Sequence, residues 1–166
     1  QEFLAHVESR SVQDASATDY VAAIGIDRFA RIRAAMGYDL AEELVQALTD
    51  RVLVVFPTAF TARLAPDTIG VRLSSNANAD SVAAMLAALR GELEQSVELQ
   101  GHRVHAGIRA GYASASGVAT AGAEILHRAE MALDQARENG CGLHAFSEEE
   151  YGDPRSRLAL LDEMRL

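Results

Sequence analysis

Compact apolar runs alternate with amphipathic stretches along this chain, and the two patterns predict strands and helices. Residues 20–26 are apolar without polar alternation, which is typical of a central strand covered on both faces. Residues 104–112 alternate between apolar and polar, which predicts a strand with two unlike faces. The pattern also predicts a hairpin of residues 59–64 and 68–73, an edge strand at 97–99 and a last strand at 143–146.

Apolar residues at helical spacing predict four helices between these strands. The first follows Asp27, which we interpret as its N-cap, and ends at Gly37. The second runs from about residue 39 until Pro57 stops it. Asp80 is interpreted as the cap of the third helix, and Asn139-Gly140 as the C-cap of the fourth, residues 121–138. The inward positions are Val82, Met85, Leu86, Leu89 and Leu93 in the third, and Ile125, Ala129, Ala132, Leu133 and Ala136 in the fourth.

The predicted element order is β-α-α-β-β-α-β-α-β. This order predicts an α+β sandwich of the split βαβ kind, with helices packed on a central, mainly antiparallel five-stranded sheet. Further helical patterns lie at residues 2–10 and from 153 onward. The chain begins with Gln1 and ends inside a helical pattern, so we interpret it as a piece of a longer protein.

Composition excludes several functions. At 166 residues the chain is one domain long, and its net charge of −9 argues against a protein that follows a nucleic-acid backbone. No apolar run is long enough to insert in a membrane, and no signal peptide is visible. The single cysteine, Cys141, fits a reducing, cytoplasmic compartment and is interpreted as a bystander. His102 and His105 point to opposite faces of a strand, so we predict no metal site and no cofactor.

Four sequence segments stand out, in this order along the chain: Ile24-Gly25-Ile26-Asp27-Arg28-Phe29, Gly37-Tyr38-Asp39, Arg63-Leu64 and Ala129-Glu130-Met131-Ala132-Leu133-Asp134-Gln135-Ala136-Arg137. Together they resemble the GGDEF family, the bacterial diguanylate cyclases that join two GTP molecules into cyclic di-GMP. The similarity covers residues 3–146. The resemblance implies a nucleotide-cyclase-like fold with a ferredoxin-like palm.

Residues 157–161 resemble the helix that connects a GGDEF domain to an EAL phosphodiesterase domain. The resemblance therefore implies a degenerate GGDEF domain at residues 1–150 and the start of a connecting helix at 151–166. The implied partner is a C-terminal EAL-type domain of the same protein, together with a possible homodimer.

The positions that carry the family's chemistry are replaced. The two metal carboxylates of the family fall on Gly25 and Thr68, neither of which is an acid. The paired glycines that let substrate approach the hairpin backbone fall on Ala65 and Pro66. The signature motif as a whole therefore consists of Ala65, Pro66, Asp67, Thr68 and Ile69.

The ligand-binding positions are altered as well. The guanine-reading pair falls on Arg33 and Glu42, and an Arg cannot accept hydrogen bonds from guanine. On the fourth helix the phosphate-binding Lys falls on Arg137, and the following Arg on Cys141. The inhibitory product-binding motif falls on two apolar residues, Phe56 and Ala59.

These replacements favour a catalytically inactive GGDEF domain that regulates or dimerises an adjacent EAL domain. One alternative is a sensor that binds GTP without cyclising it, holding phosphate at the Phe29 backbone and Arg137, with Glu42 facing the base. Another is an active cyclase in which Asp27 replaces a metal ligand, with Asp67 or Glu42 beside it.

Overall fold

The computed structural model describes residues 18–75, 78–114 and 122–147. The helices predicted at residues 2–10 and from 153 onward lie outside these residues, and so does the predicted domain boundary after residue 150. Among the described residues, no helix is both long enough and apolar enough to cross a bilayer.

A five-stranded sheet forms the centre of the domain, in the order β2-β3-β1-β6-β7. Its pairings are antiparallel except for β6 with β7, which are parallel. The strands are β1 (Thr18–Ile26), β2 (Phe60–Ala65), β3 (Thr68–Ser75), β6 (Ile108–Ser114) and β7 (Leu143–Ala145). The α+β fold and the mainly antiparallel five-stranded sheet that the sequence predicts are therefore confirmed.

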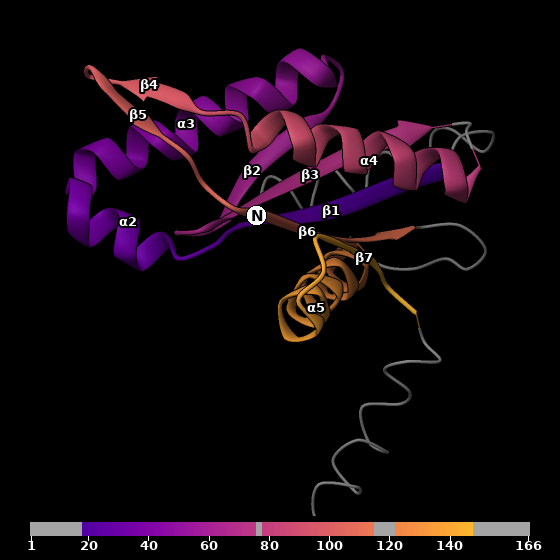
Figure 1. Ribbon diagram of the computed structural model, residues 1–166. Helices are drawn as coiled ribbons and strands as arrows, with labels where there is room; N and C mark the ends of the chain where they lie inside the picture. The colour runs from indigo at the N-terminus through magenta and orange to yellow at the C-terminus, as the bar shows by residue number, and fades with distance from the viewer. Residues whose placement is uncertain (1–17, 76–77, 115–121, 148–166) are drawn as a thin grey trace, which may run out of the picture.

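Helices cover both faces of this sheet (Figure 1). Helices α2 (Phe29–Met36), α3 (Tyr38–Val55) and α4 (Ala79–Leu93) lie on one side, and α5 (Gly122–Asn139) lies on the other. All five inward positions predicted for α5 are buried, and so are four of the five predicted for α4, with Met85 half-buried.

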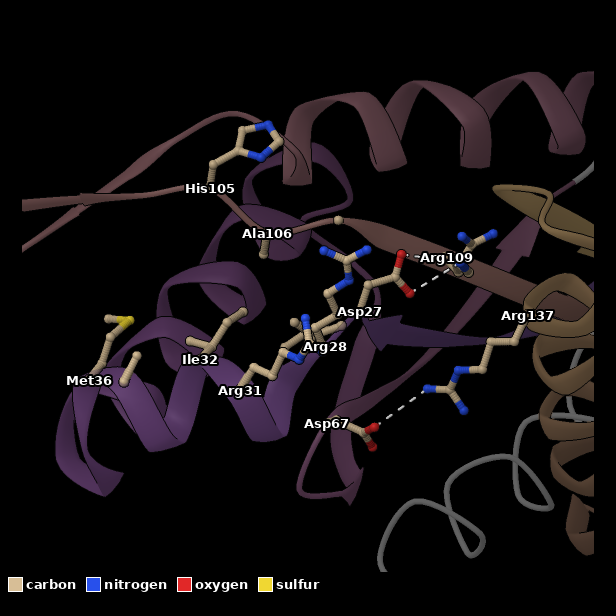
Figure 2. A pocket seen from close by; sticks show the side chains of 13 residues that line it. Asp27, Arg28, Arg31, Ile32, Met36, Asp67, His105, Ala106, Arg109 and Arg137 are labelled. Carbon is tan, nitrogen blue, oxygen red and sulfur yellow. Dashed lines mark hydrogen bonds and ion pairs between the residues drawn. The ribbon is translucent and has the colours of Figure 1, made fainter.

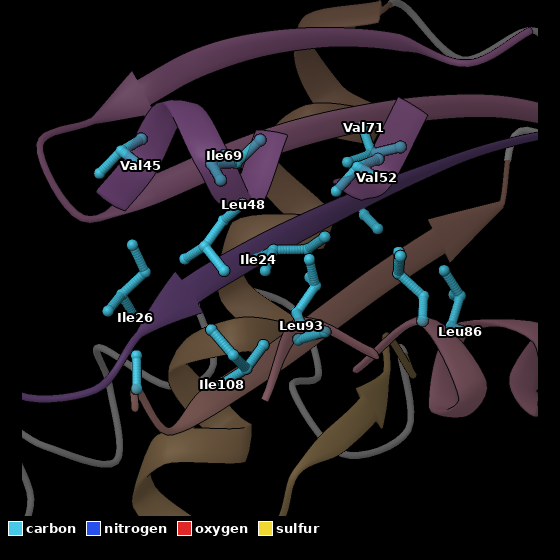
Figure 3. Packing of buried hydrophobic residues seen from close by; sticks show 14 of the residues in the cluster. Ile24, Ile26, Val45, Leu48, Val52, Ile69, Val71, Leu86, Leu93 and Ile108 are labelled. Carbon is cyan, nitrogen blue, oxygen red and sulfur yellow. The ribbon is translucent and has the colours of Figure 1, made fainter. Parts of the chain in front are cut away.

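The central strand β1 divides its side chains between two hydrophobic clusters. Ala22, Ile24 and Ile26 pack into the larger cluster with α3 and α4 (Figure 3). Val21 and Ala23 pack on the other face against Ile125, Ala129 and Leu133 of α5. Burial on both faces removes any need for polar alternation, which explains the continuous apolar run at residues 20–26. The residue of β1 that follows Ala23 on the α5 face is Gly25, and Asp27 comes directly after the strand ends at Ile26.

The strand predicted at residues 104–112 is divided in two. His102–Val104 forms β5 and pairs with β4 (Val97–Leu99) in a separate two-stranded sheet, so β4 is not an edge of the central sheet. Residues 105–107 then link β5 to β6. Ala106 is buried within this linker, so the apolar alternation continues across the break and could not reveal it.

Both aspartates predicted to cap helices have other positions. Arg28 is the N-cap of α2, with φ 56° and no side-chain cap hydrogen bond, and the Asp27 carboxylate is paired with Arg109 instead. Asn78 caps α4 by accepting a hydrogen bond from the Ser81 backbone N–H at 2.9 Å, which places Asp80 in the first turn. At α4 both Asn78 and Asp80 satisfy the residue preference for a cap, and the backbone path selects Asn78. At α2 the backbone path gives the position to Arg28, which that preference does not indicate.

Helix α5 approaches the sheet closely at Gly111 of β6. A Cβ built on Gly111 would lie 2.7 Å from the Leu133 Cα and closer still to the Leu133 backbone nitrogen. Real side chains do not tolerate such contact with backbone, so only glycine lets α5 sit at this distance from the sheet.

We expect Gly111→Ala to destabilise the domain by about 3 kcal/mol or to prevent folding, because backbone atoms of α5 cannot move aside as a flexible side chain can. Gly91→Ala is the matched control: nothing lies within 4 Å of its Cβ position on α4. There the same substitution should stabilise by about 0.5–1 kcal/mol. Urea unfolding of both variants measures the two effects, and equal effects at the two sites would contradict the proposed close contact.

Candidate functional site

A pocket of about 860 Å³ opens where the end of β1, the first turns of α2, the 105–107 linker and the hairpin turn meet (Figure 2). Its volume lies within the range of small-molecule sites. Its charged lining consists of Arg28, Arg31, Arg109 and Arg137 against Asp27 and Asp67, with His105 at the linker. The pocket is therefore cationic, although the chain as a whole has a net charge of −9.

The guanidinium of Arg137 lies over Gly25. A Cβ built on Gly25 would be 2.5 Å from Arg137 Nη2 and 3.2 Å from Leu133 Cδ2. Arg137 Nη2 also lies 3.6 Å from Asp67 Oδ2, in an ion pair that joins α5 to the hairpin turn (Figure 2). The space that a side chain at position 25 would need is thus taken by a cation.

Thr68 is paired with Gly25 across β1 and β3, and it is buried. Its hydroxyl donates to Asp67 Oδ1 at 2.9 Å. The Ile26 backbone N–H donates to the Asp67 carbonyl at 2.9 Å, which fastens the hairpin turn to the end of β1. The two positions that the resemblance assigns to metal carboxylates are therefore adjacent in space, and neither offers a carboxylate.

The Arg63 side chain hydrogen-bonds to the backbone of the hairpin turn. Its Nε donates to the Ala65 carbonyl at 2.9 Å and to the Pro66 carbonyl at 3.1 Å. Its two Nη atoms form a bidentate ion pair with Glu42 of α3, at 2.9 and 3.0 Å. Ile69, the last residue of the motif, is buried in the core and packs there as a β3 residue. The motif residues thus form a closed, internally bonded turn.

The two guanine-reading positions are also engaged by neighbours. Glu42 is exposed, yet both of its carboxylate oxygens accept from Arg63, and these hydrogen bonds hold the pKa of Glu42 below its ordinary value of 4.5. Arg33 stacks over the rings of Phe29 and Tyr38, at 5.6 and 4.8 Å from their centroids. Neither residue lines the cationic pocket.

Asp27 is bound by Arg109, a residue that the sequence analysis did not single out. Arg109 Nε lies 3.1 Å from both Asp27 carboxylate oxygens, and Arg109 Nη1 donates to the Cys141 carbonyl at 2.9 Å. The alternation of residues 104–112 already placed Arg109 on the face opposite the main core. The pairing of Arg109 with Asp27 depends on strand register. Arg109 lies opposite Gly25 on β1, two residues before Asp27.

The remaining predicted positions lie apart from this pocket. Phe56 is the C-cap of α3, and the Ala59 backbone N–H donates to its carbonyl at 3.0 Å, so the two form an apolar turn. Phe29 begins α2 with its ring buried. The structure places Gly25, Thr68, Asp67 and Arg137 together, and it separates them from the pair formed by Glu42 and Arg63.

The donor set does not fit the magnesium ion that the resemblance implies. Magnesium requires oxygen ligands, usually including one or two carboxylates. In the described parts of the chain, no three His, Cys, Asp or Glu side chains come together as a possible metal site. The two nearby carboxylates, Asp27 and Asp67, face Arg109 and Arg137.

A family model described as "Diguanylate cyclase, GGDEF domain" matches residues 1–142. No curated protein matches the sequence. A solved sensory box/GGDEF family protein from Caulobacter crescentus is 26% identical, with 84% of this chain and 90% of that chain covered and a TM-score of 0.72. The active GGEEF domain of a diguanylate cyclase from Vibrio cholerae is 19% identical (88% and 95% covered, TM-score 0.75). An EAL/GGDEF domain protein from M. capsulatus is 17% identical (88% and 95% covered, TM-score 0.76). Because the last two structures are under 25% identical to this chain, they show that the fold is similar and nothing more.

We expect Arg63→Gln to raise the pKa of Glu42 toward 4.5, because the hydrogen bonds that favour the carboxylate would be lost. A pKa lowered by folding means that this interaction stabilises the fold at neutral pH and is lost as pH falls through the folded-state pKa. Titration of the Glu42 carboxyl carbon by NMR measures the change. Arg51→Gln, which removes an Arg bonded to backbone carbonyls of residues 92, 95 and 96, is the control and should leave Glu42 unchanged.

Proposed function

Because the chain belongs to the GGDEF family of diguanylate cyclase domains, we propose that it is a member without cyclase activity that serves as a regulatory and dimerisation module in cyclic-di-GMP signalling. The family reaction is a phosphoryl transfer, which depends on metal ions to neutralise the triphosphate and activate the nucleophile. The two carboxylates that line the pocket, Asp27 and Asp67, are paired with arginines, so they are not free to bind that ion.

The observation that carries this proposal is the position of the Arg137 guanidinium over Gly25, paired with Asp67. A cation there repels a metal ion at the same point, by about 1–4 kcal/mol for each charge of the ion at 4 Å, from bulk water to a site near a protein surface. In an active site a carboxylate would supply attraction of similar size. The replacement at position 25 therefore removes that attraction, while the positive charge at position 137, which the resemblance assigns to a Lys of the family, stays.

The hairpin supports the same proposal independently. Ala65 and Pro66 carry side chains where glycines would allow close approach, and both of their carbonyls accept hydrogen bonds from Arg63. These two backbone carbonyls of the turn are thus occupied by hydrogen bonds within the protein. Glu42, the one acidic group at the guanine-reading positions, is occupied by the same Arg63.

We expect no cyclic di-GMP when the protein is incubated with GTP and Mg²⁺ or Mn²⁺, with the products measured by liquid chromatography and mass spectrometry. The active GGEEF domain from Vibrio cholerae, assayed in parallel, is the positive control. Turnover by this chain above the no-enzyme blank would contradict the proposal. GTP binding without turnover, measured by calorimetry, would instead favour the nucleotide sensor.

The double variant Gly25→Asp/Thr68→Glu tests whether the loss of the two metal carboxylates is the only reason for inactivity. We expect it to remain inactive, because a new carboxylate at position 25 would meet Arg137 Nη2 before it met a metal ion. Recovery of activity would mean that only the two ligands were missing.

Coupling to a neighbouring domain is part of the proposal. We propose that residues 1–150 form the regulatory domain and that 151–166 begin the helix that leads to an EAL domain, in line with the sequence of residues 157–161. The apolar end of α3, where Val54 is 78% exposed and Leu53 and Val55 are partly exposed, is the surface we assign to a homodimer.

In the longer protein, deletion of residues 1–150 should change the rate of cyclic-di-GMP hydrolysis at least severalfold, because a regulatory domain shifts the equilibrium of its partner. Val54→Glu should reduce the dimer fraction in sedimentation analysis, since it places a charge in the apolar surface. An unchanged hydrolysis rate after deletion would show that the domain does not regulate its neighbour.

A further inference from the structure

Strand β2 is the last strand on one side of the central sheet, beyond β3 (Figure 1). Within residues 18–75, 78–114 and 122–147, no other strand pairs with its outer edge. The outer edge of a strand carries backbone N–H and C=O groups that can pair with a further strand. β2 is six residues long, whereas β7, at the opposite edge of the sheet, has only three. β2 therefore offers the longer edge for pairing.

The features that usually prevent a strand edge from pairing are missing from the first half of β2. They include charged side chains, prolines and bulges. Phe60, Thr61 and Ala62 are uncharged, and the bulge of β2 lies further on, between Arg63 and Ala65. The charge of Arg63 is engaged elsewhere, because its guanidinium binds the turn carbonyls and a carboxylate of α3. The edge of residues 60–62 is therefore suited to pairing with another strand.

Helix α3 accompanies β2 along its length. The Arg63–Glu42 ion pair joins the later part of β2 to the beginning of α3. At the other end, the Ala59 backbone N–H donates to the Phe56 carbonyl at 3.0 Å and closes the short link from α3 to β2. The last turn of α3 and the first residues of β2 are therefore neighbours.

That last turn of α3 adds exposed apolar side chains to the strand edge. Val54 is 78% exposed, and Leu53 and Val55 are partly exposed beside it. We call residues 53–55 together with the outer edge of residues 60–62 the β2–α3 surface. Removal of such apolar area from water contributes favourable free energy to association, while strand pairing gives the contact its direction.

Charge favours a second copy of this chain as the occupant. The chain has a net charge of −9, so two copies repel each other in most orientations. Residues 52–62 contain no charged side chain, and Arg63 is paired with Glu42. In contrast, β7 is followed in the sequence by Glu148-Glu149-Glu150. The edge of β2 is therefore the one that two copies can share without placing like charges on paired strands.

Symmetry favours the same occupant. Antiparallel pairing of two copies of one strand is self-complementary, because each copy presents the same residues in the reverse order about a two-fold axis. One contact of this kind satisfies the open edges of both copies. It also joins the two five-stranded sheets into one continuous sheet.

We propose that β2 of one copy pairs antiparallel with β2 of a second copy, and that the exposed apolar ends of the two α3 helices are covered in the same contact. This strand pairing rests on the dimerisation proposed above and goes beyond it, because it names the strand that pairs and the direction of pairing. It involves neither the cationic pocket nor a nucleotide.

Hydrogen exchange of the 166-residue chain, measured by NMR at several protein concentrations, tests the pairing. Sedimentation analysis gives the dimer fraction at each concentration. We expect the β2 amides that point outward to exchange at least about tenfold more slowly in the dimer, because a paired N–H is protected from water. The amides of β7, at the other edge of the same sheet, are the internal control and should exchange equally in both states.

A charge placed on the edge tests the same contact by substitution. Thr61→Lys should weaken the dimer by about tenfold or more, because a lysine on an edge strand opposes pairing. Thr61 is half-buried, so the monomer should stay folded, which urea unfolding checks. Ala145→Lys is the matched control: it places the same charge at an exposed position of β7 and should leave the dimer unchanged.

Four results would overturn the strand pairing. The first is a chain that stays monomeric up to about 1 mM. The second is a dimer whose β2 amides exchange as fast as those of the monomer, which would leave α3 alone as the contact. The third is equal protection of β2 at all concentrations, because other residues of the same chain would then cover the edge. The fourth is an unchanged dimer in Thr61→Lys. None of these results bears on cyclase activity, so the two proposals fail separately.

Discussion

The close packing of α5 on the sheet is the constraint on which the rest of this site depends. The Leu133 backbone lies so near Gly111 that no side chain fits between them. This contact sets the height of α5 above β1 and β6. One turn after Leu133, Arg137 then lies over Gly25, a second glycine on that face of the sheet. Two glycines thus bring a cation to the end of β1, one by admitting the helix and the other by leaving room for its guanidinium.

Three ion pairs connect different parts of the chain, two of them in the pocket and the third beside the hairpin turn. Arg137–Asp67 joins α5 to the hairpin turn, Arg109–Asp27 joins β6 to the end of β1, and Arg63–Glu42 joins β2 to α3. All three are partly exposed, and such pairs stabilise folded proteins little, by about 0–1 kcal/mol each. Their consequence is chemical rather than energetic, because each engages a carboxylate that would otherwise be available to a metal ion or a base. Within the part of the chain that the structure describes, the pocket's Arg28 and Arg31 have no such partner.

The sequence predicted most elements because the buried stripes of its helices and its central strand are continuous. It could not predict the break between β5 and β6, since Ala106 and Ile108 maintain the alternation across the linker. It also misplaced two helix caps. Asp27 and Asp80 are both plausible N-caps by residue type, but the backbone assigns that position to Arg28 and Asn78. Residue preference locates a helix start only to within one or two residues, and the path of the backbone decides which residue is the cap.

The sequence by itself determined which chemical groups are present: no acid at positions 25 and 68, no glycines at 65 and 66, and arginines at 28, 31, 63, 109 and 137. Those facts follow from residue identity, and the fold class follows from hydrophobic periodicity. Only the tertiary structure decided which arginine faces which carboxylate. Pairing depends on strand register and on how closely α5 approaches the sheet, and both arise from contacts between residues far apart in the chain. The same contacts leave Arg28 and Arg31 facing an open pocket, which no local pattern of the sequence reveals.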